Sequence, residues 1–314
     1  MKKTSLKNLK IYLAGHNGMV GRALFDNFKK IGAKKIIISS RKNLDLLDVN
    51  KLRKFVKKNK PDIIINCAGR VGGILANSTY PVQFLNENIL IQLNLINLAF
   101  ENNVKHFINL GSSCIYPKNS KQPIKENYLL TSPLEKTNEA YALAKIIGLK
   151  ACDFYNQQYK TNYFTLMPCN LYGPNDNYDL KTSHFFPALI FKALAAKKNK
   201  KNELTLWGSG RPKRELMYVD DLADACIYFL NKKTKDPLIN IGTGHDKSIL
   251  EYAKFILKKI DFKCKIVLDK SKPDGTKRKI IDNSIALSYG WKPKINLDEG
   301  FDLTLKSYLS KSSK

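Results

Sequence analysis

The sequence has no uninterrupted apolar segment close to the roughly 18 residues that a membrane span requires, so no membrane-embedded protein is expected. Its six cysteines form no Cys-x-x-Cys pair and no other metal-binding spacing, which argues against a metal site. Dispersed thiols are typical of a reducing compartment. We therefore expect a cytoplasmic protein without a bound metal.

Acidic residues are also scarce: 27 Asp and Glu face 54 Lys and Arg, which gives a formal net charge of +27. Such an excess can indicate a nucleic-acid-binding protein. Here the excess is mostly lysine spread along the whole chain, and the lysine-rich run 197–201 contains no aromatic residue. We interpret the charge as a solvated surface, expect no nucleic-acid partner, and note that a positive field favours a polyanionic substrate.

The chain of 314 residues is 43% hydrophobic, enough to bury the core of one large domain or of two joined domains. Short apolar segments alternate with amphipathic helical segments, the pattern of parallel strands joined by crossover helices. The expected strands are 10–14, 35–39, 62–67, 106–110 and 164–168, and the expected helices are 20–31, 83–102, 138–159 and 250–260. This order predicts an α/β fold, a doubly wound parallel sheet with a smaller α+β domain. The larger domain should cover 1–172 and 217–242, and the smaller one 173–216 and 243–314.

A glycine-rich loop lies between the first expected strand and the first expected helix. It reads Gly15-His16-Asn17-Gly18-Met19-Val20-Gly21, with the spacing Gly-x-x-Gly-x-x-Gly. Such glycines permit a tight turn and a close backbone approach to pyrophosphate, whose charge the helix N-terminus then stabilises. In this strand-loop-helix setting, the loop predicts a Rossmann-like site for a dinucleotide cofactor.

The residues at the end of the second expected strand indicate which dinucleotide cofactor the site binds. It reads Ser39-Ser40-Arg41, without the acidic residue that usually binds the ribose 2′-hydroxyl of NAD. Arg41 is suited to pair with a 2′-phosphate, so the sequence favours NADP(H). Asp48 is a candidate for an adenine contact, although it fits a helix cap equally well.

A catalytic group is indicated by Tyr141 and Lys145, which stand four residues apart on one face of the expected helix 138–159. A nearby ammonium group favours the phenolate, so we expect Lys145 to lower the pKa of Tyr141. Tyr141 would then exchange a proton with a sugar oxygen while hydride moves at the same carbon. Ser112 follows the fourth expected strand and is placed to hold that oxygen.

With these residues in place, the chain resembles the extended short-chain dehydrogenases and, more narrowly, the GDP-L-fucose synthase family, which are GDP-4-keto-6-deoxymannose 3,5-epimerase/4-reductases. The resemblance runs over nearly the whole chain. Besides the glycine loop, it is carried by Val71-Gly72-Gly73-Ile74, Gly111-Ser112-Ser113-Cys114-Ile115-Tyr116-Pro117, Asn170-Leu171-Tyr172-Gly173-Pro174, Ser183-His184, Trp207-Gly208-Ser209-Gly210 and Arg278-Lys279-Ile280-Ile281-Asp282.

The resemblance implies further functional residues and partners. It implies that Cys114 and His184 are the acid-base pair that inverts C3 and C5, and that the substrate is a GDP-linked keto sugar. It places nucleotide-sugar contacts at Lys192, Trp207, Arg214 and Asp282. Further cofactor contacts would be Leu110, Gly111, Ser113, Pro168, Asn170, Leu171 and His184, together with Tyr141 and Lys145. A homodimer built on the expected helices 83–102 and 138–159 would also fit the family.

Two positions depart from the family pattern and leave the sugar open. Cys169 stands where threonine is usual, and Arg70 stands where a lysine commonly precedes Val-Gly-Gly. Three hypotheses remain at this point: the bifunctional epimerase-reductase that makes GDP-L-fucose, a relative that reduces C4 of another GDP-keto-sugar such as a heptose, and a protein that binds NADP(H) without turnover. The presence of Ser112, Tyr141 and Lys145 argues against the last.

Overall fold

The computed structural model describes residues 6–312 except 181, 233 and 273. Its centre is a six-stranded parallel sheet with the strand order β2-β1-β3-β4-β5-β9. These strands are β1 (Lys10–Ala14), β2 (Lys35–Ile37), β3 (Ile63–Asn66), β4 (His106–Leu110), β5 (Tyr163–Pro168) and β9 (Leu238–Ile241). The order reverses between β1 and β3, so the fold is the doubly wound one expected from the sequence, which confirms that prediction.

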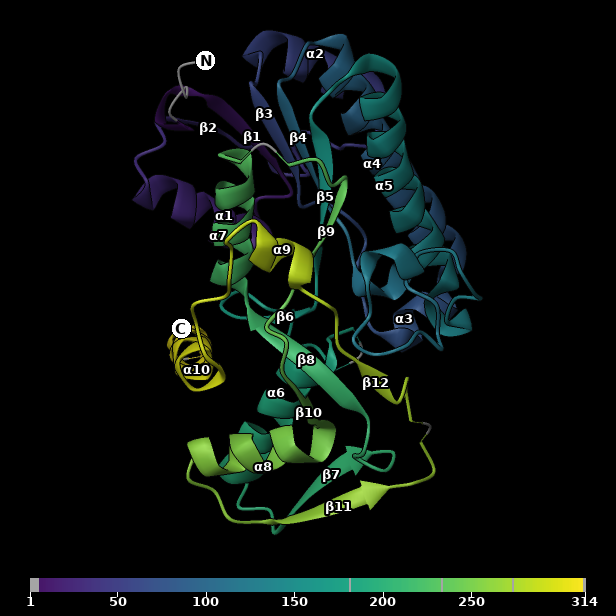
Figure 1. Cartoon of the computed structure of the whole chain (residues 1–314). Coiled ribbons are helices and arrows are strands. Elements are labelled where there is room, and N and C mark those ends of the chain that lie inside the picture. The colour runs from purple at the N-terminus through teal and green to yellow at the C-terminus, as the bar shows by residue number, and fades with distance from the viewer. Residues whose placement is uncertain (1–5, 181, 233, 273, 313–314) are drawn as a thin grey trace.

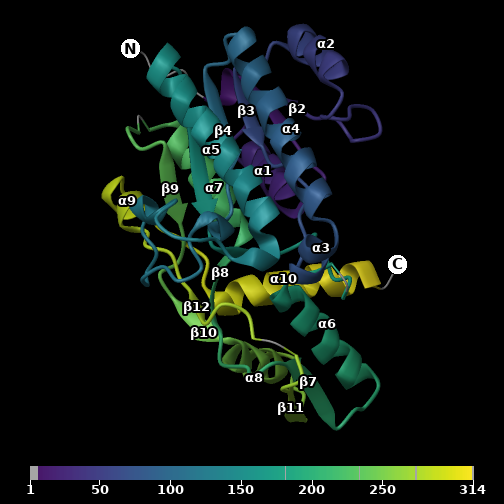
Figure 2. The same ribbon diagram turned by 90° about the vertical axis from the view of Figure 1, so that its right-hand side faces the viewer.

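Helices cover both faces of this sheet (Figures 1 and 2). One face carries α1 (Met19–Lys30), α7 (Val219–Leu230) and the short α9 (Ser284–Ser288), and the other carries α2 (Val49–Asn59), α4 (Pro81–Glu101) and α5 (Glu139–Tyr159). The strands β1, β3 and β4 read as continuous apolar runs because both of their faces are buried. Each face of the sheet therefore has its own core, one built around Phe28 and Phe229 and the other around Phe107 and Tyr163.

A second layer lies below the carboxyl ends of the sheet strands (Figure 1). It contains α6 (Phe185–Lys198) and α8 (Ile249–Lys259), the parallel pair β7 (Glu203–Trp207) and β11 (Lys265–Asp269), and a small sheet formed by β6 (Asn170–Tyr172), β8 (Lys213–Tyr218), β10 (Asp246–Ser248) and β12 (Arg278–Lys279). A separate core holds this layer together, with Phe186, Tyr252 and Phe301 at its centre. The remaining elements are α3 (Ile74–Thr79), α10 (Leu297–Ser312) and the 3-10 turns η1 (Leu6–Asn8), η2 (Ser113–Ile115), η3 (Glu126–Tyr128) and η4 (Lys136–Asn138).

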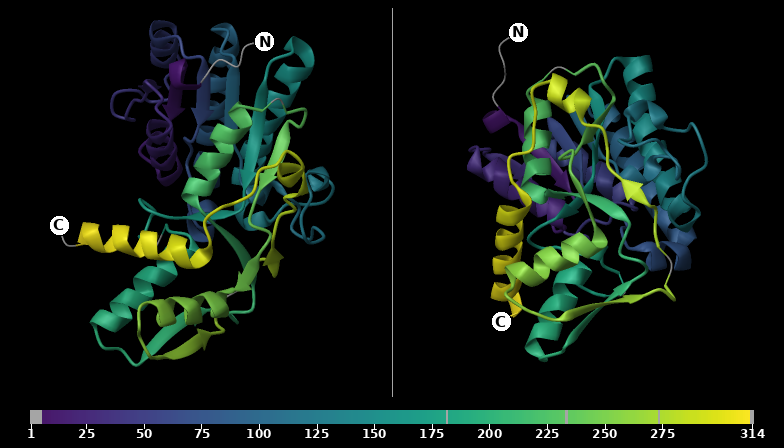
Figure 3. Two further views of the ribbon diagram at one scale, coloured as in Figure 1. Left: turned by 60° about the vertical axis from the view of Figure 1, so that its left-hand side comes forward. Right: turned by 60° about the horizontal axis from the view of Figure 1, so that its bottom comes forward.

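The packing differs from the expected division of the chain in one segment. Residues of 281–291 had been assigned to the smaller domain, yet Ile281, Ala286 and Trp291 lie in the core of the large sheet. The indole N–H of Trp291 donates to Asp224 on α7 at 3.0 Å, which fixes the segment there. The chain therefore returns to the larger layer once more before α10. Figure 3 shows α10 running between the two layers, where Lys311 contacts Asn175.

The other helices and strands begin and end close to the expected residues. The segment 173–216 contains more regular structure than expected. This stretch was expected as an irregular, substrate-facing segment, and it contains α6, β7 and the start of β8. In the part of the chain that is described, no helix has both the length and the apolar character needed to cross a bilayer.

Candidate active site

The glycine loop joins β1 to α1 by a turn that only small residues can form. Gly15 has φ +87°, and a Cβ atom there would lie 2.7 Å from the backbone nitrogen of Ala68. A Cβ atom on Gly21 would collide with the carbonyl oxygen of Gly15. Gly18, by contrast, is the exposed N-cap of α1 and has open space beside it. The first turn of α1, with Met19 and Val20, therefore presents its N-terminus to solvent without a side-chain cap, as an anion site requires.

Two side chains of this loop also fit a bound cofactor. Asn17 is exposed, whereas His16 is buried, and its Nδ1 atom has no hydrogen-bond partner among the described residues. Desolvation lowers the pKa of His16, and the positive charge of Arg22 lowers it further, so the imidazole is neutral at neutral pH. A neutral ring nitrogen without a partner, beside an uncapped helix N-terminus, is available to hydrogen-bond a ligand.

The two residues expected to select the cofactor lie in different settings. Arg41 is exposed just after β2, and its Nε atom lies 3.8 Å from Asp45, a distance that constrains the guanidinium little. Asp48 is the N-cap of α2 and accepts a hydrogen bond from the backbone N–H of Lys51 at 3.0 Å. The helix-cap interpretation of Asp48 is thus the one whose contacts are present. Its adenine contact stays a prediction.

The expected catalytic pair lies on the buried face of α5. Lys145 donates from Nζ to the carbonyl oxygen of Leu110 at 2.9 Å, and its Nζ lies 5.7 Å from the centre of the Tyr141 ring. Burial lowers the pKa of Lys145 to about 8. Because Lys145 is anchored to the carboxyl end of β4, the Tyr141 ring is fixed above the same edge of the sheet as the glycine loop.

The expected effect of Lys145 on Tyr141 is not what the structure gives. Burial raises the pKa of Tyr141, the neighbouring Cys114 thiol raises it further, and a hydrogen bond from Ser112 only partly opposes them. Desolvation of the buried phenol disfavours its charged form. Tyr141 is therefore held as the protonated phenol, the form that donates a proton during reduction.

Ser112 connects Tyr141 to the candidate epimerase thiol. It is the N-cap of η2, and its hydroxyl lies close enough to Tyr141 and Cys114 to lower the pKa of both groups. Burial raises the pKa of the Cys114 thiol, while the positive charges of Lys279 and Lys145 lower it. A phenol and a thiol that lie beside the same hydroxyl can both act on adjoining atoms of one small ring.

His184 comes from another part of the chain, the start of α6. It is the N-cap residue of α6 and follows Ser183, whose backbone oxygen would be 3.1 Å from a Cβ atom on Gly73. Desolvation lowers the pKa of His184, and the buried hydroxyl of Ser183 has no hydrogen-bond partner within the described ranges. Among those residues no hydrogen bond joins His184 to Cys114, so their role as an acid-base pair stays a prediction.

The remaining predicted cofactor residues follow the carboxyl ends of β4 and β5. Close packing there leaves no room for a larger residue, since a Cβ atom on Gly111 would collide with the Met167 side chain. This edge of a doubly wound sheet is where ligands bind in such folds. The residues concerned are Leu110, Gly111, Ser113, Pro168, Asn170 and Leu171.

Three of the four expected nucleotide-sugar residues are cationic or aromatic side chains of the second layer. Lys192 of α6 lies with its Nζ 5.1 Å from the Trp207 ring centre. Arg214 of β8 donates to the carbonyl oxygen of Thr276 at 2.7 Å, and burial lowers the pKa of both Arg214 and Lys192. Half-buried cations that have no carboxylate partner among the described residues are suited to a diphosphate.

Asp282, the fourth, lies elsewhere. Its carboxylate accepts from the backbone N–H of Ser284 at 2.8 Å, and it lines a separate cavity of about 590 Å³ together with Lys125, Glu126 and Asp153. The buried Ile281 before it, whose N–H is bound by Glu215, turns the chain away from Arg214. The substrate contact at Asp282 stays a prediction.

Sequence reasoning missed two residues that the structure brings to the site. Lys279 pairs in register with Arg214 between β12 and β8, and its charge acts on the Cys114 thiol. Asp274 binds the loop after Trp207, accepting from the backbone N–H of Ser209 at 2.8 Å and from its hydroxyl at 2.6 Å. Neither residue stands near its partner in the sequence, so only the strand pairing reveals them.

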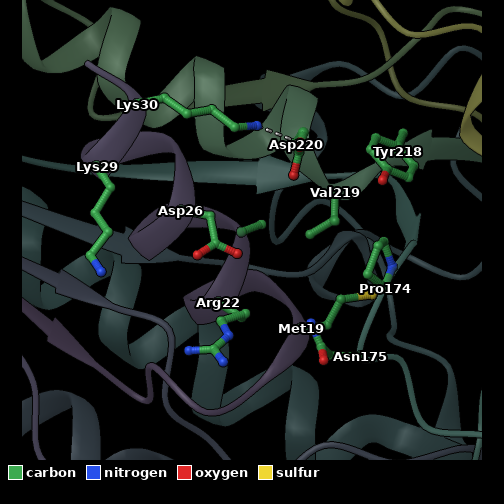
Figure 4. A pocket seen from close by; sticks show the side chains of 11 residues that line it. Met19, Arg22, Asp26, Lys29, Lys30, Pro174, Asn175, Tyr218, Val219 and Asp220 are labelled. Atoms are coloured by element: carbon green, nitrogen blue, oxygen red, sulfur yellow. Dashed lines mark ion pairs between the residues drawn. The ribbon is translucent and has the colours of Figure 1, made fainter. Parts of the chain in front are cut away.

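A further cavity of about 400 Å³ lies beside α1 (Figure 4). Arg22, Asp26 and Lys29 line it from α1, and Lys30 forms an ion pair with Asp220 across it at 3.7 Å. Of the predicted site residues only Met19 reaches it, so it is not the catalytic centre. No group of three or more His, Cys, Asp or Glu side chains able to hold a metal occurs in the described part of the chain.

Comparison with known proteins agrees with this arrangement. The model of the NAD dependent epimerase/dehydratase family matches residues 11–242. A GDP-L-fucose synthase of Sinorhizobium fredii is 44% identical over 305 residues, 97% of each chain. A crystal structure of a GDP-6-OMe-4-keto-L-xylo-heptose reductase from C. jejuni superposes with a TM-score of 0.91 at 34% identity, covering 97% of this chain and 99% of that one. A GDP-L-fucose synthetase from Naegleria fowleri bound to NADP gives a TM-score of 0.90 at 26% identity, with coverages of 98% and 95%. The resemblance found in the sequence is thereby confirmed, and the chain belongs to the NAD dependent epimerase/dehydratase family.

Proposed function

We propose that this protein epimerises C3 and C5 and reduces C4 of GDP-4-keto-6-deoxy-D-mannose, with NADPH as the reductant, to form GDP-L-fucose. The observation that carries the proposal is the contact of Ser112 with both Tyr141 and Cys114, because a plain reductase needs no thiol beside its tyrosine. The S. fredii relative, at 44% identity over 97% of both chains, supports the same activity.

The chain's own residues have distinct roles in this proposal. Ser112 orients the O4 oxygen, and Tyr141, held protonated by burial, donates the proton to it. Cys114 removes a proton that the 4-keto group has made acidic, and Lys279 and Lys145 favour its thiolate. His184, neutral because of its lowered pKa, exchanges protons from the loop that precedes α6. Arg214 and Lys192 bind the diphosphate.

The cofactor fits the glycine loop, whose exposed Gly18 leaves room for a phosphate and whose His16 retains an unpartnered nitrogen. NADPH bound there supplies the hydride that is added to C4. Arg41 would hold the 2′-phosphate once it leaves its weak contact with Asp45.

The decisive experiment is incubation of the enzyme with NADPH and GDP-4-keto-6-deoxy-D-mannose in D₂O, followed by NMR of the product. The proposal requires GDP-L-fucose with deuterium at C3 and C5. Failure to oxidise NADPH with this substrate would reject it.

A second candidate is a C4 reductase for a related GDP-4-keto-6-deoxy-sugar such as a heptose. One observation favours it: the heptose reductase from C. jejuni superposes with a TM-score of 0.91. The same NMR experiment separates the two candidates, because a pure reductase leaves C3 and C5 without deuterium.

We also propose a homodimer and a cytoplasmic location. The outer faces of α4 and α5 expose Leu90, Leu143, Ile147 and Phe154, an apolar surface that suits a helix-to-helix dimer contact. The six free cysteines suit a reducing compartment. The division into two domains, with the boundaries given above apart from 281–291, likewise remains a proposal.

Cofactor choice gives the first mutational prediction. Arg41→Ala should weaken NADPH binding by about tenfold or more, the effect of losing one charge-assisted pair, and should leave NADH binding nearly unchanged because NADH has no 2′-phosphate. Fluorescence titration with both cofactors measures this. Equal losses for the two would show that Arg41 does not bind the 2′-phosphate. Arg53→Ala, which removes an exposed arginine paired with Glu101 on α4, is the matched control.

A further inference from the structure

A chain of buried amide side chains runs beneath the candidate active site. Asn66 of β3 donates from Nδ2 to Oδ1 of Asn109 on β4 at 3.2 Å, and Asn109 donates in turn to Oε1 of Gln92 on α4 at 3.2 Å. All three side chains are buried, with no more than 1% of each residue's surface exposed. Burying an amide is costly unless its donors and acceptors are satisfied, so these hydrogen bonds hold the three side chains in fixed positions.

One end of this amide chain holds the segment against which the glycine loop packs. Oδ1 of Asn66 accepts from the backbone N–H of Ala68 at 3.1 Å. The same backbone nitrogen would lie 2.7 Å from a Cβ atom on Gly15, so the two backbones are in direct contact. Because Gly15 begins the turn into α1, this end of the amide chain fixes the position of the candidate cofactor loop.

The other end of the amide chain holds the candidate catalytic helix. Nε2 of Gln92 donates to the carbonyl oxygen of Ala144 on α5 at 2.9 Å. Ala144 directly precedes Lys145, and Asn109 directly precedes Leu110, whose carbonyl oxygen accepts from Lys145. Gln92 therefore connects the same two elements, α5 and β4, as the hydrogen bond between Lys145 and Leu110, one residue earlier on each.

The space around the Gln92 amide is closed where α4 and α5 lie side by side (Figure 2). A Cβ atom on Gly148, one turn after Ala144, would lie 2.1 Å from Oε1 of Gln92 and 3.1 Å from Nδ2 of Asn109. Nε2 of Gln92 also donates to the carbonyl oxygen of Asn88 on its own helix at 2.9 Å. An amide that is bound at both ends, opposite a glycine, fixes how closely α5 approaches α4.

We propose that Gln92 is a positioning residue for hydride transfer, whose amide sets the position of Tyr141 and Lys145 relative to the cofactor loop. This inference rests on the proposed function. With 1% of its surface exposed, Gln92 acts through Ala144 and Asn109 rather than by touching a substrate. A misplacement of about 1 Å at the reacting groups can lower a rate by about 100-fold. Loss of the amide should therefore lower kcat and leave the binding of NADPH and sugar nearly unchanged.

The test compares Gln92→Met with Gln92→Glu in the whole enzyme. Methionine has nearly the size of glutamine but cannot hydrogen-bond Ala144 and Asn109 as the amide does. With NADPH and the GDP-keto sugar, Gln92→Met should lower single-turnover hydride transfer by about tenfold or more. The Kd of NADPH and the KM of the sugar should stay within about twofold of wild type.

Gln92→Glu tests whether restoring the hydrogen bonds restores the rate. Burial raises the pKa of a carboxyl group, so at about pH 6 the glutamate is protonated, accepts from Asn109 and donates to Ala144. It should then retain most of the wild-type rate. As the pH rises through the raised pKa, the carboxylate forms beside the Ala144 carbonyl, and the rate relative to wild type should fall toward that of Gln92→Met. This dependence decides the proposal even if Gln92→Met does not fold.

Asn156→Leu is the matched control at the other end of α5. Oδ1 of Asn156 accepts from the backbone N–H of Tyr163 on β5 at 2.9 Å, so this amide also ties α5 to the sheet, but away from Lys145. Its loss should lower the melting temperature and leave kcat within about twofold of wild type. Native hydride transfer in a folded Gln92→Met enzyme, an equal loss of kcat in Asn156→Leu, or no recovery of Gln92→Glu at low pH would overturn the proposal.

Failure of the proposed function has a different signature. A wild-type enzyme that does not oxidise NADPH with the fucose precursor rejects the proposed sugar, whereas hydrogen exchange of the α5 backbone needs no substrate. Gln92→Met should speed exchange in the segment 141–148 by about tenfold or more, and Asn156→Leu should not. Unchanged exchange in this segment of Gln92→Met rejects the positioning role, whatever the turnover.

Discussion

Replacing Tyr141 by phenylalanine should lower hydride transfer to the keto sugar by about 100-fold or more, the usual scale for the loss of a general acid. The phenol is buried, and desolvation together with the Cys114 thiol raises its pKa, so in the native enzyme it carries the proton that O4 needs. Phenylalanine keeps the ring that packs edge-on against Phe84 at 6.1 Å between centroids, so the fold should be preserved. Single-turnover NADPH oxidation measures the effect.

The matched control is Tyr155→Phe on the same helix. The Tyr155 hydroxyl donates to Asn97 on α4 at 2.9 Å, away from Ser112, and its removal should leave turnover within about twofold. The NADPH affinity of both variants should equal that of wild type. A folded Tyr141→Phe enzyme that oxidises NADPH at close to the native rate would exclude Tyr141 as the acid.

Most strands and helices were predictable because each is specified by a hydrophobic pattern within a short stretch of sequence. The strands 10–14 and 106–110 were placed with the bounds that the structure has, since both are apolar runs that end just before a glycine-containing turn. The helix α6 was missed because its apolar residues cover most of its circumference: Phe185, Phe191 and Leu194 lie off the stripe formed by the buried Phe186, Leu189, Ile190 and Ala193. Such a helix has no polar face to produce a period of 3.6 residues.

The site was predictable only where its residues lie close together in the sequence. Ser112, Cys114, Tyr141 and Lys145 belong to two short motifs, and the structure brings Ser112 close to Tyr141 and Cys114 and binds Lys145 to the Leu110 carbonyl. The sign of the pKa shift at Tyr141 could not be obtained from spacing, because it depends on how deeply the phenol is buried. Spacing gives the Tyr–Lys pair, and burial decides which protonation state it stabilises.

The remaining site residues are brought together by pairing between strands that are far apart in the sequence. Lys279 reaches Cys114 because β12 pairs with β8. Asp282 closes a sequence motif whose Ile280 and Ile281 are buried, and it lines another cavity, so its role as a substrate contact stays a prediction. Only the strand register shows which residues of distant segments lie side by side.

Epimerisation should depend on Cys114 in a way that reduction does not. Cys114→Ser keeps the size of the side chain and its contact with Ser112, but a hydroxyl has a pKa far above that of a thiol and is a poor base. Exchange of deuterium into C3 and C5 in D₂O should fall by about 100-fold or more. Reduction of the unepimerised ketone should continue slowly, because Tyr141 and Lys145 remain. NMR of the product measures both, since it should then retain the starting configuration at C3 and C5.

His184→Asn should show the complementary defect, and it tests whether the separate placement of His184 matters. Asparagine preserves some hydrogen bonding but cannot exchange a proton, so one of the two centres should lose its inversion while reduction persists. Cys264→Ser, on a partly buried thiol that packs in the core of the second layer, is the control for thiol loss and should behave as wild type. If the wild-type enzyme incorporates no deuterium at either carbon and still oxidises NADPH, the enzyme is a reductase only. Cys114 would then be a packed thiol whose contact with Ser112 orients the serine, and the heptose-type reductase would replace the fucose synthase as the better account of this site.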